Sequence, residues 1–261
     1  MLGGSSGRID DARAQLLAAQ GALAESIRWF GGAGQQPAPF EVPLETFQQR
    51  VELLARDCDR IVLVGTSFGA EAALVTAAVT PAVCAVAAFA PSDVVWAGVT
   101  PEGRQTSHWT LGGEPLPFVP FVESAEPQGD PPSFRPVYEA SRAAQPDAVA
   151  RATIAVERIP HVLCVAGGDD QVWPSVAHAE AIRDRRAASG RPTTVVVDPD
   201  AGHRAVLPGE PVVTAGQRMA RGGSQDADHR LGAAAWPVLL ELLSAPAGAG
   251  PAPTPGPAPA S

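Results

Sequence analysis

Residues 60–79, RIVLVGTSFGAEAALVTAAV, place a serine between two glycines where an apolar strand gives way to a small-residue helix. Ile61 to Val64 is a mostly β-branched run, the composition of a strand buried on both faces. Ala70 to Val79 is rich in alanine and is predicted to be helical. The turn between them is Gly65-Thr66-Ser67-Phe68-Gly69. This stretch predicts an α/β architecture with a serine at the end of a buried strand.

The turn fits the pattern G-x-S-x-G, which marks the nucleophile elbow of α/β-hydrolases. Its glycines let the strand and the helix approach closely, and its serine sits in a strained turn with an exposed Oγ. The alternative is an ordinary strand–turn–helix connection without a catalytic role. A catalytic reading therefore requires an acid and a histidine further along the chain.

Length and composition fit one domain with a sizeable core, since 45% of the 261 residues are hydrophobic. A net charge of −9 argues against nucleic acid or an anionic membrane surface as a partner. No apolar run approaches the ~20 residues of a membrane span, and no signal peptide opens the chain. The three cysteines are scattered, so we read them as reduced thiols and expect a cytoplasmic location. All 19 basic residues are arginine, which excludes a catalytic lysine.

Strand-like and helix-like segments alternate along the chain, which predicts a mostly parallel, doubly wound sheet within an ordered domain at residues 1–244. Residues 245–261 form a Pro/Ala-rich stretch that we expect to be a disordered tail. Helices are expected at 11–20, 44–56, 70–79, 175–189 and 231–243, and strands at 61–64, 83–89, 162–166 and 193–197, with an extended segment at 23–29.

Residues 91–160 break this alternation with a segment rich in proline and aromatic residues. An excursion of this kind after a central strand predicts a cap over the site, whereas the alternative is a surface loop that its aromatic residues only anchor. We expect Trp96 and Trp109 in this segment, together with Trp173, to contact the substrate.

The acid is expected in the segment HVLCVAGGDDQVWPS, residues 161–175. A strand there ends in a glycine turn with two carboxylates, Asp169 and Asp170, and α/β-hydrolases place the acid after the serine. Such sites commonly read G-x-x-D with a proline a few residues on, which favours Asp170 because Pro174 follows it. Asp169 is then a turn or supporting carboxylate.

The base is expected at His203, which follows the strand TTVVVD in a loop after a glycine. This position agrees with the chain order serine, acid, histidine. In that arrangement His203 takes the proton of Ser67, and Asp170 holds the imidazole in the required tautomer. The other four histidines are less suitable, because two precede the acid and two lie in or near predicted helices: His108, His161, His178 and His229.

Two backbone N–H groups are needed to stabilise the oxyanion of the tetrahedral intermediate. One is expected from Phe68, the residue after the nucleophile, at the positive end of the following helix. The other is expected from the early loop LGGSSGRID, with the N–H of Ser5 as the candidate. The alternative for this loop is a flexible Gly/Ser segment. No metal site or cofactor is expected.

Four stretches together resemble the catalytic domain shared by acyl-CoA thioesterases and bile-acid-CoA:amino-acid N-acyltransferases: GTSFGAEAAL, GGDDQVWPS with its following helix, AGHR, and RWFGGAGQQPAPFEVPLETF. The resemblance covers roughly residues 3–243, and DDQVWPS is its most specific part. It places Ser67, Asp170 and His203 at the nucleophile, acid and base positions. The chain departs from the family at Phe68, where relatives usually have lysine.

The resemblance implies a serine hydrolase that forms an acyl-enzyme and hydrolyses acyl-CoA thioesters, because members with serine mostly hydrolyse whereas cysteine favours transfer to an amine. Its substrate is then a small acyl thioester or ester. The alternatives are a general carboxylesterase or dienelactone-type hydrolase, an acyltransferase to an amine, and a catalytically silent binding module. Relatives have strands before the oxyanion loop, so we expect a sheet that lacks its first strands, with one uncovered edge. If so, we expect either that the true start codon lies upstream or that this form of the protein is a weakened enzyme.

Overall fold

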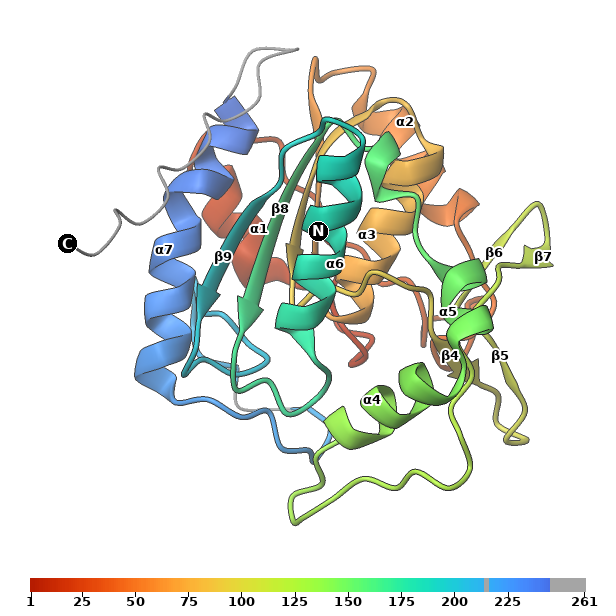
Figure 1. Cartoon of the computed structure of the whole chain (residues 1–261). Coiled ribbons are helices and arrows are strands. Elements are labelled where there is room, and N and C mark those ends of the chain that lie inside the picture. The colour runs from red at the N-terminus through yellow and green to blue at the C-terminus, as the bar shows by residue number, and fades with distance from the viewer. Residues whose placement is uncertain (214–215, 245–261) are drawn as a thin grey trace.

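The computed structural model describes residues 1–213 and 216–244 as a mixed α/β protein (Figure 1). The stretch 245–261, predicted to be a tail, lies outside these residues. In chain order the elements are α1 (Asp11–Ala18), β1 (Val42–Pro43), α2 (Glu45–Leu54), β2 (Ile61–Thr66), α3 (Phe68–Val79), β3 (Val83–Phe89), β4 (Ala97–Val99), β5 (Gln105–Ser107), β6 (Trp109–Leu111), β7 (Glu114–Pro115), α4 (Arg135–Ala144), α5 (Pro146–Ala152), the short 3₁₀ helix η1 (Val156–Arg158), β8 (His161–Gly167), α6 (Ser175–Ala188), β9 (Thr194–Asp198) and α7 (Gln225–Ser244).

The central sheet contains four parallel strands in the order β2-β3-β8-β9. Nearly every residue of β3 and β8, the two inner strands, is buried. Continuous apolar strands of this kind are typical of parallel sheets that are covered on both faces. The parallel α/β organisation predicted from the alternation of elements is therefore confirmed.

Helices cover both faces of this sheet (Figure 1). On one face, α3 and α6 pack against the strands through buried side chains that include Leu74 and Ile182. On the other face, α1 and α7 do the same through Leu17 and Leu239. Full burial of one such aliphatic side chain stabilises the fold by about 1.5–3 kcal/mol, so these two layers keep the strand ends in place.

The start of the chain joins the sheet beside β2. Leu2 N–H donates to the carbonyl of Val64 at 2.8 Å, and Leu2 O accepts from Thr66 N–H at 3.1 Å. Leu2 also forms a parallel bridge with Ile27. The edge of β2 is thus paired at this level, which differs from the uncovered edge that we predicted. The segment 23–29, predicted to be extended, contributes this bridge at Ile27 rather than a strand.

Residues 91–160 interrupt the strand–helix alternation, as predicted, with short antiparallel pairs and two short helices. β4 pairs with β5, and β6 pairs with β7 and, in parallel, with β1. Figure 1 shows α4 near the end of the sheet toward which β8 and β9 point. The excursion therefore lies at the carboxyl end of the parallel strands, where α/β proteins place their ligands.

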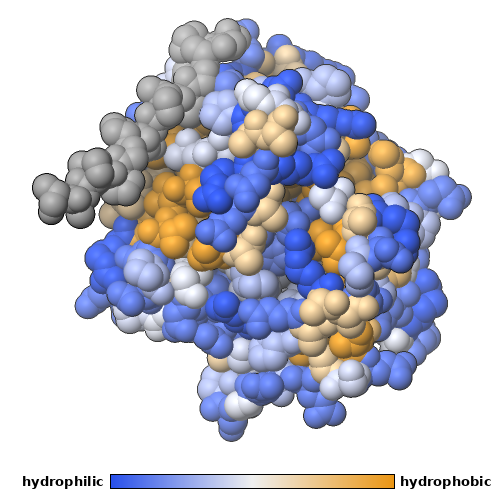
Figure 2. Space-filling view, in the orientation of Figure 1, coloured by the Kyte–Doolittle hydropathy of each residue, from blue (hydrophilic) through white to orange (hydrophobic). Residues whose placement is uncertain are grey.

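The face drawn in Figure 2 is mainly hydrophilic, with apolar side chains gathered beside α7 and around the α4–α5 region. Large apolar residues that are well exposed are spread over the described surface, for example Leu23 and Val213. Within residues 1–213 and 216–244, no helix combines the length and the apolar character needed to cross a bilayer.

Candidate active site

Ser67 occupies a strained turn between β2 and α3. Its backbone has φ 58° and ψ −125°, a conformation that residues with a side chain rarely adopt. The N–H of Ser67 donates to Phe89 O at 2.9 Å, which ties the turn to the neighbouring strand. A Cβ added to Gly65 would collide with the carbonyl of Gly69, and one added to Gly69 would collide with the carbonyl of Leu2. Both glycines of the motif are therefore required by close backbone packing.

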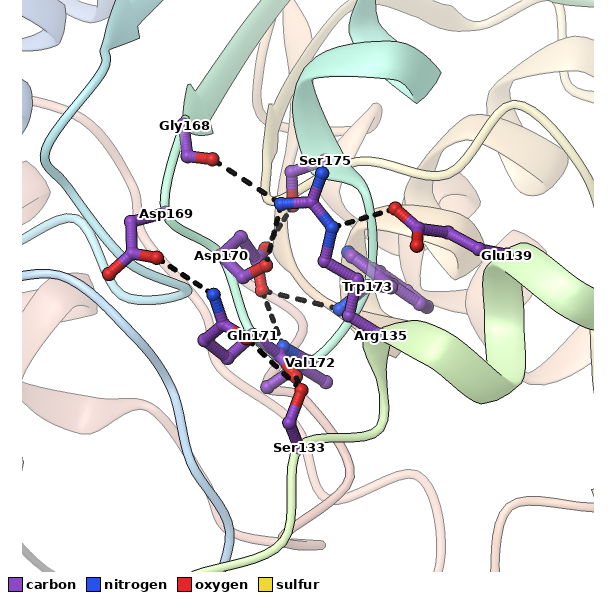
Figure 3. A network of polar contacts seen from close by, with 10 residues as sticks. All are labelled: Ser133, Arg135, Glu139, Gly168, Asp169, Asp170, Gln171, Val172, Trp173 and Ser175. Carbon is purple, nitrogen blue, oxygen red and sulfur yellow. Dashed lines mark hydrogen bonds and ion pairs between the residues drawn. The ribbon is translucent and has the colours of Figure 1, made fainter. Parts of the chain in front are cut away.

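Asp170 follows β8 and has no exposed surface. Its Oδ1 accepts the N–H groups of Val172 at 2.8 Å and Trp173 at 3.3 Å, and its Oδ2 accepts the Ser175 hydroxyl (Figure 3). Oδ2 also lies 2.8 Å from His203 Nδ1. Burying a carboxylate is costly unless it is hydrogen-bonded and paired, and here both oxygens are bound.

Asp169 has a different environment, although it is the next residue before Asp170 in the chain. Its carboxylate is exposed and accepts Gln171 Nε2 at 2.7 Å and the Gly223 N–H at 2.7 Å. Figure 3 shows Asp169 and Asp170 pointing in different directions. Asp169 thus joins two surface loops, while Asp170 is the carboxylate directed at a histidine.

The turn that carries both aspartates is bound to the excursion through Arg135 at the start of α4 (Figure 3). Arg135 Nη1 donates to the backbone carbonyls of Asp170 at 3.2 Å and Gly168 at 3.4 Å, while its Nε pairs with Glu139 at 2.7 Å. Ser133 Oγ donates to Gln171 O at 2.9 Å. This support was not predicted, since nothing local in the sequence connects residue 135 with residue 170.

His203 lies in the loop after β9 and is almost wholly buried, with 7% exposure. Its backbone N–H donates to the backbone carbonyl of Arg221 at 2.8 Å. Its ring packs edge-on against Trp173, with the ring centroids 5.8 Å apart. Because Nδ1 faces Asp170, this nitrogen carries the proton and Nε2 is left to accept one. No hydrogen bond joins Ser67 Oγ to His203 within the part of the chain that the structure describes. Such contacts often tighten only when substrate binds.

Ser67 and His203 line one cavity of about 530 Å³. Its wall combines the early loop, the elbow, the excursion and the loops after β8 and β9, with mainly apolar side chains from the excursion. A volume of this size accommodates a drug-sized ligand. The lining residues include Gly4, Ser5, Phe68, Val99, His108, Phe121, Tyr138, Arg204 and Arg221.

The early loop lies beside Ser67, where the second oxyanion donor was predicted. Gly4 faces Ser67 so closely that an added Cβ would lie 3.2 Å from Ser67 Cβ. Ser5 and Phe68 both line the cavity. The pairing of Leu2 with β2 explains this placement, because it brings the next residues to the carboxyl end of the strand. Donation by the N–H groups of Ser5 and Phe68 stays a prediction.

The three tryptophans expected to contact the substrate do not line the described cavity wall. Trp96, Trp109 and Trp173 have no exposed surface. Trp96 and Trp173 share a buried cluster with Tyr138, and Trp109 packs against Phe47 at 5.9 Å between centroids. The tryptophans pack behind the residues that line the cavity, since Trp96 and Trp173 contact the Tyr138 ring and Trp109 Nε1 donates to Glu71 of α3. The aromatic residues that do line the cavity are Phe68, Phe121, Phe134 and Tyr138.

Three arginines far apart in the sequence meet beside Gly216, and we call them the arginine cluster. A Cβ added to Gly216 would lie 3.2 Å from Nη2 of Arg204, 3.2 Å from Nη2 of Arg221 and 3.5 Å from Nη2 of Arg8. Burial and the nearby charges of Arg221 and Arg8 lower the pKa of Arg204 to about 10. Sequence reasoning missed this cluster because no local run of basic residues marks it. Concentrated positive charge of this kind attracts anions.

The family model described as BAAT / Acyl-CoA thioester hydrolase C terminal matches residues 42–245. The match includes Ser67, Asp170 and His203, whereas Arg8 and the early loop precede it. A comparison with curated proteins gives no match. Since the family model covers well over half of the sequence, the chain belongs to the BAAT / acyl-CoA thioester hydrolase C-terminal family, which implies hydrolase or acyltransferase chemistry on acyl thioesters.

Proposed function

We propose that this protein is a serine hydrolase of the α/β-hydrolase fold that cleaves acyl-CoA thioesters through an acyl-enzyme on Ser67. The observation that carries the proposal is the convergence of a strained serine turn and a carboxylate-bound histidine on one cavity. In this proposal, the buried carboxylate of Asp170 orients the imidazole of His203, so that Nε2 acts as a base directed toward the cavity.

Acylation begins when His203 Nε2 takes the proton of Ser67 Oγ as the oxygen attacks the thioester carbonyl. The N–H groups of Phe68 and Ser5 stabilise the resulting oxyanion, and the N-terminal end of α3 adds a favourable dipole. When the tetrahedral intermediate collapses, the carbon–sulfur bond breaks and the imidazolium returns its proton to the leaving sulfur. The products of this step are the free thiol and an ester of Ser67.

Deacylation repeats these steps with water. His203 takes a proton from the water molecule as its oxygen attacks the Ser67 ester, and the same proton then goes to Ser67 Oγ as the acid is released. Asp170 remains ionised throughout and stabilises the imidazolium. An amine in the place of water would give acyl transfer, for which no residue of the described cavity provides separate support.

The arginine cluster supports coenzyme A as the leaving group. Coenzyme A carries several phosphates, and arginine binds phosphate through bidentate, charge-assisted hydrogen bonds. Arg204 and Arg221 line the same cavity as Ser67. In this proposal, the excursion at residues 91–160 is the cap, because Val99, Phe121 and Tyr138 supply its side of the wall for the acyl chain.

The test treats the purified protein with a fluorophosphonate probe and with a panel of acyl-CoAs and simple esters, followed by mass spectrometry of the trapped acyl-enzyme. Labelling is expected at Ser67, absent in Ser67→Ala and strongly reduced in His203→Ala. Equal labelling of the wild type and Ser67→Ala would refute the nucleophile. Turnover of esters but not of acyl-CoAs would favour a carboxylesterase, and a protein that turns over neither would be a binding module.

A further inference from the structure

Glu71 is a buried acid close to Ser67 that the proposed mechanism does not use. It lies one turn further along α3 and has no exposed surface. Its Oε1 accepts Trp109 Nε1 at 2.7 Å and the N–H of Trp96 at 3.3 Å, and lies 3.0 Å from His108 Nδ1. Its Oε2 has no partner within the described part of the chain. A carboxylate so placed is costly to bury, and its donors hold it in one orientation.

His108 lies between Glu71 and the cavity. The side chain is 1% exposed yet lines the cavity wall, and its ring centroid is 4.3 Å from that of Phe68. Because Nδ1 lies 3.0 Å from the Glu71 carboxylate, it carries a ring hydrogen, and the neutral tautomer that this contact favours has its lone pair on Nε2. Nε2 makes no hydrogen bond within residues 1–213 and 216–244. The pair thus repeats the carboxylate–imidazole arrangement of Asp170 and His203.

Tyr138 lines the same cavity as His108 and provides a second polar side chain there. Its ring centroid lies 4.7 Å from that of Trp96, and the carbonyl of Trp96 accepts the N–H of His108 at 3.2 Å. The Tyr138 hydroxyl has no hydrogen-bond partner among the described residues. Burial and the negative charges of Glu71 and Asp170 raise the pKa of Tyr138, so the hydroxyl keeps its proton. The excursion otherwise offers mainly apolar side chains here, such as Val99, Phe121, Phe134 and Val137.

We propose that His108 and Tyr138 bind a neutral hydroxyl group on the acyl chain, with Glu71 as the positioning residue. The inference rests on the proposed function and adds the class of acyl group, namely hydroxyacyl in preference to plain acyl of the same length. A hydroxyl donates to His108 Nε2 and accepts from Tyr138 Oη, whereas a methylene leaves both atoms unpaired. Sites built around such polar atoms discriminate against analogues that lack the matching group.

The negative charges beside Tyr138 disfavour a carboxylate as the preferred group at this wall. Glu71 and Asp170 are both buried near Tyr138, and their charges disfavour a further negative charge there. A carboxylate also lacks the hydrogen that the lone pair of His108 Nε2 requires. The neutral hydroxyl satisfies both the hydrogen-bonding pattern and the local charge.

The experiment compares kcat/KM of the full chain for four p-nitrophenyl esters with six-carbon acyl groups: hexanoate, 3-hydroxyhexanoate, 6-hydroxyhexanoate and the adipate monoester. At least one hydroxy ester is expected to exceed hexanoate by about tenfold, the effect of one well-placed hydrogen bond, and the adipate monoester to fall below hexanoate. A wild-type preference for hexanoate over both hydroxy esters, equal values for all three, or a preference for the adipate monoester would overturn the proposal.

Variants locate the preference on the two side chains. Tyr138→Phe removes one oxygen, and His108→Phe removes the lone pair, so both should reduce the ratio of hydroxy ester to hexanoate toward one while hexanoate is still hydrolysed. Leu23→Ala, at an exposed position outside the cavity, should leave the ratio unchanged. Because His108→Phe deprives Glu71 of a partner and can impair folding, Tyr138→Phe decides the outcome on its own. An unchanged ratio in folded Tyr138→Phe would refute the proposal.

A binding measurement separates this inference from the proposed function. Hexanamide and its two hydroxylated counterparts are neutral and are not cleaved, so calorimetric titration of the wild type requires no turnover. Tighter binding of a hydroxylated amide, lost in Tyr138→Phe, would support the hydroxyl site even if Ser67 were not the nucleophile. Equal dissociation constants for the three amides would refute the site even if ester hydrolysis through Ser67 were established.

Discussion

Asp170 Oδ2 lies 2.8 Å from His203 Nδ1, and the carboxylate that makes this contact is completely buried. Two backbone N–H groups and the Ser175 hydroxyl hold the same carboxylate in place. The His203 imidazole therefore faces an acceptor that is held in a fixed position. If the ring rotated, Asp170 Oδ2 would lose its hydrogen bond to Nδ1.

Asp170→Asn should lower kcat by about 10⁴, because an amide at this position no longer enforces the imidazole tautomer that leaves Nε2 free. Asp169→Asn is the matched control, since it removes the adjacent carboxylate, which binds Gln171 and Gly223 instead. We expect Asp169→Asn to change kcat only slightly. Steady-state kinetics with one p-nitrophenyl ester measure both effects. A larger loss of kcat in Asp169→Asn than in Asp170→Asn would identify Asp169 as the acid.

Ser67→Gly should abolish turnover and raise the free energy of unfolding by about 1 kcal/mol, because glycine adopts the φ of 58° without strain. The Ser67 side chain makes no helix-capping hydrogen bond, so its removal costs no cap. Ser67→Ala is the control, since alanine is also inactive but keeps the strain. Urea denaturation measures both, and equal stability of the two variants would show that the turn stores no strain.

Gly69→Ala should destabilise the fold by about 1–3 kcal/mol, because its Cβ would collide with the carbonyl of Leu2. Displacement of the early loop should also lower kcat by about 10² to 10³, the cost of one oxyanion donor. Gly32→Ala is the control, since its nearest neighbour is the flexible end of the Gln35 side chain. Gly69→Ala with full kcat at a temperature where it is folded would show that this loop donates nothing to the oxyanion.

Arg221→Gln and Arg8→Gln should each raise KM for an acyl-CoA by about tenfold, because charged hydrogen bonds to phosphate are lost. KM for the corresponding N-acetylcysteamine thioester, which has no phosphate, should stay constant. Arg183→Gln, at an exposed ion pair with Asp184 on α6, is the control for general charge effects. Parallel increases of KM for both thioesters would place the arginine cluster outside the leaving-group site.

Asp93 should make the protein sensitive to acid. Burial alone would raise the pKa of its carboxyl, but the hydrogen bonds and charges of His178 and Arg142 outweigh burial and hold this pKa below its ordinary value. A depressed pKa contributes stability above the unfolded value of about 4, and this contribution disappears as the pH falls below it.

Asp93→Asn should therefore be less stable than the wild type at pH 7 by roughly 3–5 kcal/mol, the cost of breaking a buried ion pair, and the gap should narrow toward pH 3. Asp147→Asn removes an exposed carboxylate and serves as the control. Urea denaturation at both pH values provides the measurement. If the difference in unfolding free energy between the wild type and Asp93→Asn were the same at pH 7 and pH 3, ionisation of Asp93 would not contribute to the stability of the fold.

The sequence by itself determined the order of the main elements and the residues of the serine turn. Strands 83–89 and 61–64 could be predicted because continuous apolar runs between turn residues have few alternatives. The acid and the histidine could be nominated because strand exits are visible in the sequence. Asp170 could be preferred over Asp169 from the spacing to Pro174, and the two carboxylates indeed have different partners in the structure.

Only the tertiary structure decided what meets across the chain. Leu2 pairs with β2, the three arginines converge on Gly216, and Glu71 reaches His108 because the sheet and the excursion bring distant segments together. Sequence patterns report which face of an element is apolar, but not which distant side chain it meets. The buried tryptophans show this limit. A large aromatic residue near a site can form its wall or the layer behind it, and the difference depends on packing across several elements at once.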